Sequence, residues 1–102
     1  MSRLEMKFDE DMKELYFITK KECRYNATRF LQIVAEKGGV AAAKQLIARP
    51  GGTEGFEKLW ECGRLDLSIE AYVLKPEYDS LFTDEEKRRC RELLMSMGYK
   101  VD

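Results

Sequence analysis

The chain has 102 residues, of which 44% are hydrophobic and 36% are charged, and it contains only two prolines. This length fits one domain, and the apolar fraction is too high for a disordered chain. The 18 Lys and Arg residues balance 19 Asp and Glu residues, so the whole molecule has no field that would attract nucleic acid or anionic lipid. We therefore expect one folded domain over residues 1–102.

The first element that the sequence predicts is a long helix over about residues 2–21. Apolar residues recur there every three or four positions, which is the spacing of one buried helical stripe: Leu4, Phe8, Met12 and Leu15. Met6 and Phe17 fall on nearly the opposite side of this helix. They are a candidate interaction face for a protein partner or a second copy of the chain, and the alternative is that they are simply exposed.

The same N-terminal segment carries a charged residue every two or three positions. It therefore has neither the apolar run of a signal peptide nor the length of a membrane span. We expect a cytoplasmic protein that does not enter the membrane.

A compact helical part is predicted over about residues 26–98. Asn26 is placed to cap its first helix, because its side chain can accept a hydrogen bond from an amide of the first turn. Ala27, Phe30, Leu31, Val34 and Ala35 form the apolar face of that helix. Gly38 can end it in a left-handed conformation, and Gly39 would allow a close approach of neighbouring backbone. The next helix is expected from about residue 40 to residue 48.

The segment "ARPGGT" at residues 48–53 is predicted to break the chain between helices, because proline disfavours helix before it and the glycines permit a sharp turn. Thr53 is the predicted cap of the following short helix. Phe56, Leu59 and Trp60 would share one face of it, which places Trp60 in the core. Gly63 is the predicted C-terminal stop.

Two further helices complete the pattern. Ser68 is the predicted cap of the first, and Pro76 ends that helix or begins the next turn. Thr83 and Glu86 form a capping box, in which each side chain bonds the other residue's backbone amide. Gly98 ends the last helix, whose apolar stripe contains Cys90, Leu93, Leu94 and Met97. The sequence thus predicts an all-α, compact bundle of five to six helices.

The residues available for chemistry are few. Cys23, Cys62 and Cys90 lie 39 and 28 positions apart, without the close pairs of a zinc or redox motif, so we expect free, reduced thiols. There is no histidine, the usual acid, base and partner of a nucleophile near neutral pH. We therefore expect a non-enzymatic protein with no cofactor and assign no catalytic residue.

Glu61, Asp66 and Glu70 are the best acidic cluster in the sequence. Carboxylates at such positions could bind a divalent cation and activate water, which would suit a metal-dependent hydrolase. The structural alternative is stronger, because Arg64 can pair with a nearby carboxylate while Asp66 or Ser68 caps a helix. We assign no metal site.

The segment "VAEKGGVAAAKQLI" at residues 34–47 is similar in its Ala-Gly-Val spacing to a helix-turn-helix that reads DNA. Its polar candidates for nucleic-acid contact are Lys37, Lys44, Gln45 and Arg49. The alanines of the second helix cannot read bases, and Gln45 replaces an expected apolar packing position. The glycines are better explained by turn geometry and close packing.

The runs "YNATRFLQIVAEKGGVAAAKQLI" and "GFEKLWECGRLDLSIEAYVLKPEYDSLFTDEE" are distinctive, especially "LWECGRLDLSIEA" and "LFTDEE". Over about residues 25–99 the chain resembles a small bacterial family of short, stand-alone, uncharacterised helical proteins. The resemblance implies a bacterial cytosolic origin and supplies no activity, cofactor or site residue. Our leading interpretation is a helical module that binds a protein partner as an adaptor or regulator, with DNA binding as the alternative.

Overall fold

The computed structural model describes residues 2–49 and 55–101, and every regular element in these two ranges is helical. The elements are α1 (Arg3–Cys23), α2 (Thr28–Lys37), α3 (Gly39–Ile47), α4 (Phe56–Glu61), the 3₁₀ helix η1 (Leu65–Leu67), α5 (Ile69–Val73), the 3₁₀ helix η2 (Pro76–Leu81) and α6 (Asp84–Ser96). The all-α prediction is confirmed. The predicted cap Thr53 and the break around it lie outside the described residues.

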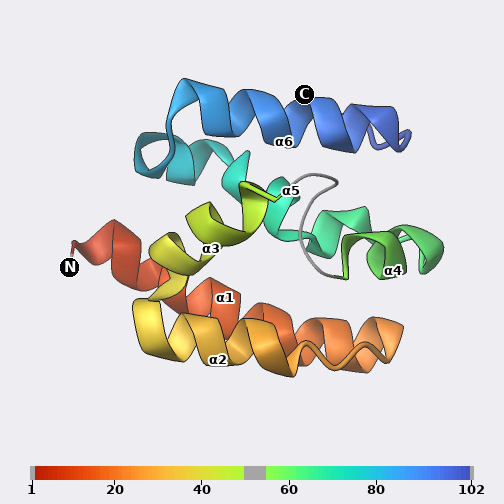
Figure 1. The fold of residues 1–102 in the computed structure, drawn as a ribbon, viewed down its shortest axis with the longest axis horizontal. Coiled ribbons are helices and arrows are strands. Elements are labelled where there is room, and N and C mark those ends of the chain that lie inside the picture. The colour runs from red at the N-terminus through yellow and green to blue at the C-terminus, as the bar shows by residue number, and fades with distance from the viewer. Residues whose placement is uncertain (1, 50–54, 102) are drawn as a thin grey trace.

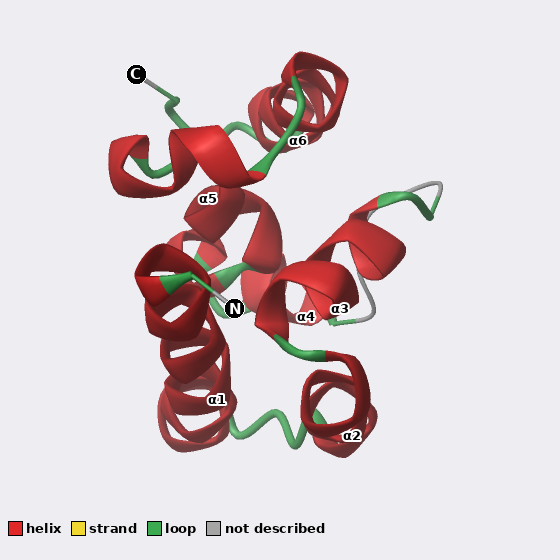
Figure 2. Cartoon of the chain, turned by 90° about the vertical axis from the view of Figure 1, so that its left-hand side faces the viewer, coloured by secondary structure: helices red, strands yellow, loops and turns green. Residues whose placement is uncertain are grey.

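The helices form two outer layers with shorter helices packed between them. Figure 1 shows α1 and α2 along one side of the molecule and α6 along the other, with α3 and α5 between them. The view turned by 90° in Figure 2 also places α1 beside α2 and far from α6. Helix α3 contacts α1, α2, α5 and α6, so it is the central element of the core.

Helix α1 begins at a capping box, in which Ser2 Oγ accepts from the Glu5 amide at 3.1 Å and Glu5 Oε1 accepts from the Ser2 amide at 3.3 Å. Its predicted stripe is confirmed, because Phe8, Met12 and Leu15 are buried. Helix α1 therefore contributes one full face to the core.

The turn between α2 and α3 consists of Gly38, whose φ of 87° is the backbone conformation that favours glycine. Gly39 follows, and a Cβ atom there would lie 2.7 Å from Cα of Asp9. The Gly39 amide also donates to Asp9 Oδ1 at 2.8 Å. The close approach predicted at Gly39 is thus confirmed, and its partner is α1. Gly38 has a positive φ, but its ψ of 161° is extended instead of left-handed helical, so that prediction is only partly confirmed.

The remaining caps also follow the prediction. Ser68 Oγ accepts from the Ala71 amide at 3.1 Å, and the Thr83–Glu86 capping box is present at both of its bonds. Gly63 and Gly98 have φ values of 75° and 82° just beyond their helices. Local chemistry therefore sets the start of α5, both ends of α6 and the stop of α4.

Two predictions about side chains are wrong. Asn26 does not cap α2, whose N-cap position is Ala27; its Oδ1 instead accepts from the Tyr16 hydroxyl at 2.6 Å. Trp60 is 46% exposed instead of buried, because Phe56 and Leu59 already fill the core-facing side of the short helix α4. The face expected for α2 is also narrower, with Val34 its only buried residue.

The sequence reading missed a segment of the core in η2. Tyr78 is fully buried there, and its ring lies edge-on to that of Phe8 with centroids 4.9 Å apart. The ring of Phe82, just after η2, also packs against the Phe8 ring, with centroids 5.3 Å apart. The Tyr78 hydroxyl donates to Asp11, and burial followed by this bond raises the pKa of Tyr78. These contacts attach η2 to α1.

Candidate functional site

The outer face of α1 carries the predicted interaction residues. Met6 is 52% exposed and Phe17 is 62% exposed. They are eleven residues apart, close to three full helical turns, so they lie on one stripe separated by roughly 16 Å along the axis. Glu10 and Lys13 lie between them on this stripe and are exposed. We call Met6, Glu10, Lys13 and Phe17 the outer face of α1.

The Phe17 ring is partly fixed by a neighbour on the same helix. It lies edge-on to the Tyr16 ring, with centroids 5.0 Å apart and an interplanar angle of 84°. Tyr16 is itself held by the bond from its hydroxyl to Asn26. The contact with Tyr16 therefore restricts the exposed Phe17 ring, which lowers the entropy cost of burying that ring in an interface.

The residues proposed for DNA contact are engaged with other groups. Lys37 Nζ donates to Gln45 Oε1 at 2.7 Å, both on the surface at the α2–α3 turn. Lys44 Nζ forms an ion pair with Glu86 Oε1 at 2.7 Å and lies 5.3 Å from the centre of the Phe82 ring. The charge of Lys44 thus joins α3 to α6, where Glu86 partly neutralises it.

The position of α3 restricts it further as a recognition helix. Its buried residues are Gly39, Ala42, Ala43, Leu46 and Ile47. On its outer side only Ala41 and Gln45 are exposed, and Gln45 is the single polar side chain of the two. A helix that reads DNA needs several base-contacting side chains on one free face.

Arg49 lies apart from the α2–α3 turn, at a cavity of about 310 Å³ between the end of α3 and α6. The cavity is lined by Ile47, Arg49, Glu70, Arg89, Cys90, Glu92 and Leu93. Arg89 crosses its edge and donates to the Ala48 carbonyl oxygen at 2.9 Å. Sequence reasoning missed this cavity because its walls come from three separate segments.

The acidic residues of the metal hypothesis are not brought together. Glu61 and Asp66 are exposed, whereas Glu70 is 1% exposed at the cavity beside α6. Within residues 2–49 and 55–101, no group of three or more Cys, Asp or Glu side chains is placed to hold a metal ion. Asp66 instead takes both bonds from Arg64, Nε to Oδ1 at 3.0 Å and Nη2 to Oδ2 at 3.2 Å, as the structural alternative predicted.

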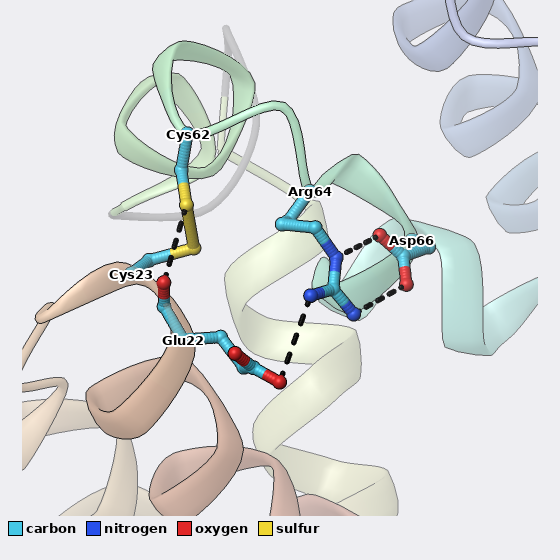
Figure 3. The surroundings of a disulfide bond; sticks show 5 residues. All are labelled: Glu22, Cys23, Cys62, Arg64 and Asp66. Carbon is cyan, nitrogen blue, oxygen red and sulfur yellow. Dashed lines mark hydrogen bonds and ion pairs between the residues drawn. A yellow bond between two sulfur atoms is a disulfide. The ribbon is translucent and has the colours of Figure 1, made fainter.

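The prediction of three free thiols is wrong for two of them. Cys23, the last residue of α1, and Cys62, the residue after α4, form a disulfide with Cα atoms 5.8 Å apart. Figure 3 shows that Arg64, in the turn between α4 and η1, also reaches α1, with Nη1 3.8 Å from a Glu22 carboxylate oxygen. The 39-residue separation concealed this pair, because only the packing of α4 on α1 brings the two residues together.

Cys90 is a free thiol, as predicted, and it is buried in α6. Burial and the nearby charges of Glu70 and Glu86 raise the pKa of Cys90 to about 12. The thiol therefore stays protonated at neutral pH, where it behaves as a small apolar side chain.

Comparison with protein-family models, with curated proteins and with solved structures gives no match. Among the described residues, no helix is both long enough and apolar enough to cross a membrane.

Proposed function

We propose that this protein is a non-enzymatic helical module that acts by binding another protein through the outer face of α1. The observation that carries the proposal is the joint exposure of Met6 and Phe17 on one stripe of a 21-residue helix. The core of the molecule uses the other stripe of α1, where Phe8, Met12 and Leu15 are buried, so Met6 and Phe17 lie outside it. Aromatic and methionine side chains are enriched where proteins bind each other.

The size of the expected effect follows from the area that binding would cover. Met6 and Phe17 are each about half exposed, so covering both would contribute about 2 kcal/mol. A loss of that size weakens Kd roughly thirtyfold. Glu10 and Lys13, between the two apolar residues, would form the polar part of the same interface. They favour a partner that places a cation opposite Glu10 and an anion opposite Lys13.

The proposal is tested by comparing partner capture by three forms of the protein. Met6→Ser with Phe17→Ser removes the apolar residues, and Met95→Ser is the matched control because Met95 is 60% exposed on α6. Proteins captured from cell extract are quantified, and light scattering measures self-association. We expect one partner, or a second copy of the chain, to bind the Met95→Ser control as well as it binds the unchanged protein. The amount of this partner captured by the double variant should be at least tenfold lower. Equal capture by all three forms would exclude this face.

Duplex DNA is the alternative ligand, and the exposed pair Lys37 and Gln45 at the α2–α3 turn is the observation in its favour. Fluorescence anisotropy of a random duplex, at low and near-physiological salt, separates the two classes of partner. The protein-binding proposal predicts no saturable binding. Salt-sensitive binding that Lys37→Ala with Gln45→Ala weakens would favour DNA at this turn.

We also propose that the protein is bacterial and cytoplasmic, following the family resemblance. The disulfide weighs against the cytoplasm, because such bonds persist mainly in oxidising compartments. Trapping thiols with an alkylating agent in intact cells, followed by mass analysis, decides the matter. A cytoplasmic protein should show Cys23 and Cys62 reduced for most of the population, whereas full oxidation points to an exported protein.

A further inference from the structure

The Cys23–Cys62 bond is unequally shielded on its two sides. Cys23 is 8% exposed beneath the end of α1, whereas Cys62 is exposed. The bond lies in an open hollow of about 370 Å³ whose lining is Glu22, Cys23, Arg24, Lys58, Glu61 and Cys62. Both cysteines line this hollow, and Cys62 is the more exposed of the two residues, so it is the one that a small thiol reaches more readily.

Helix α4 is joined to α1 covalently by this bond. It has six residues, too few to be stable as a helix on its own. Phe56 and Leu59 attach it to the core, and Arg64 links the following turn to Glu22 and Asp66 through exposed ion pairs, which stabilise little. The disulfide is the strongest link between α4 and α1.

We propose that the Cys23–Cys62 bond is a redox-reactive site at which a small thiol attacks Cys62, and that its reduction releases α4 from α1. The thiolate forms a new S–S bond with Cys62 Sγ, the old S–S bond breaks, and Cys23 Sγ leaves with the electron pair and takes a proton from water. A second thiolate attacks the sulfur of the bound thiol. Cys62 is then released as a thiolate and is protonated in turn. The protein disulfide gains two electrons, and two small thiols become one small disulfide.

The hollow fits a thiol that carries both signs of charge. Arg24 and Lys58 are placed to attract carboxylates, and Glu22 and Glu61 to attract an ammonium group. Cys90 takes no part, because it is buried in α6 with its pKa raised to about 12. The chemistry is therefore confined to one end of the molecule.

The first test identifies the sulfur that is attacked. Oxidised protein is incubated with reduced glutathione, quenched with acid, alkylated and analysed by peptide mass spectrometry. We expect most of the trapped mixed disulfide to carry glutathione on Cys62 and the alkyl group on Cys23, without denaturant. A majority of glutathione on Cys23, or reaction only after unfolding in urea, would overturn the proposal.

The second test follows α4 by amide hydrogen exchange before and after reduction. The reporters are the amides of Leu59, Cys62 and Arg64, which donate to backbone oxygens at 3.0, 3.0 and 2.8 Å. After reduction we expect them to exchange within tenfold of the unstructured chain, while interior amides of α6 keep at least hundredfold protection. Protection retained at α4, or lost at α6 as well, would contradict local release. Cys62→Ser should match the reduced protein without any reductant.

Discussion

Removing the Cys23–Cys62 bond should lower the stability of the protein substantially. The bond closes a loop of 39 residues, and the loss of loop-closure entropy in the unfolded chain corresponds to about 4 kcal/mol for a loop of this size. The entropy of unfolding for a chain of 102 residues is about 0.21 kcal/mol per kelvin, so this free energy corresponds to a drop in Tm of roughly 18 °C. The variant Cys62→Ser leaves the buried Cys23 thiol in place and avoids a cavity.

The assay is thermal unfolding followed by circular dichroism, for the oxidised protein, the reduced protein and Cys62→Ser. The reduced protein and the variant should melt at the same temperature, roughly 18 °C below the oxidised protein. Reductant should not move the Tm of Cys62→Ser, since that chain has no disulfide to lose. A drop of less than about 5 °C would contradict this prediction, because the disulfide would then contribute only about 1 kcal/mol instead of about 4 kcal/mol.

Three further perturbations test the local structure. Thr83→Ala removes the cap of α6 and should cost about 1 kcal/mol, or roughly 5 °C in Tm, measured by the same thermal assay. Gly39→Ala should lower the free energy of unfolding in urea by about 2 to 3 kcal/mol, because its Cβ would lie 2.7 Å from Cα of Asp9. The control Gly63→Ala, with a φ of 75° and open space around it, should cost only about 1 kcal/mol. Equal costs would contradict the close approach at Gly39. Burial raises the pKa of Glu86, but hydrogen bonds from Lys44 and Thr83 outweigh it and leave this pKa below its ordinary value. The stabilisation from Glu86 is therefore full above the unfolded pKa and is lost as pH falls through the folded pKa. The difference in unfolding free energy between the unchanged protein and Glu86→Gln should therefore be largest near neutral pH and shrink in acid, and a constant difference would contradict this assignment.

Local chemistry made the helical plan predictable from the sequence. Ser68, Thr83 and Glu86 satisfy amides within three residues of themselves, so the pattern needs no knowledge of the rest of the fold. Gly38 and Gly63 similarly act through their own φ angles. The stripe of α1 was predictable because its period of three to four residues is a property of one helix.

Contacts between distant segments were not predictable in the same way. Asn26 has the residue type of a cap, but Tyr16 on α1 takes its side chain instead. Cys23 and Cys62 carry no spacing motif, and their bond follows from how α4 packs on α1. Tyr78 lies in a polar run that gives no periodic pattern, although it is fully buried. Each of these depends on tertiary packing, which a single sequence does not encode as a local pattern.

The candidate interaction face was partly accessible to the same reasoning. The helical period placed Met6 and Phe17 opposite the buried stripe, and the structure shows both exposed. The sequence predicts Trp60 in the core because it would share one face of its helix with Phe56 and Leu59, but only those two residues face the core and Trp60 is 46% exposed. Whether an exposed apolar side chain is used for binding is a property of the partner as well as of the chain.

The most direct test of the protein-binding proposal is photo-crosslinking in living cells from position 17. A photoreactive phenylalanine analogue replaces Phe17 in one form of the protein and Met95, equally exposed on α6, in another. We expect discrete crosslinked products from position 17 that are absent from position 95. No product from position 17, or the same products from both positions, would contradict a partner on the outer face of α1.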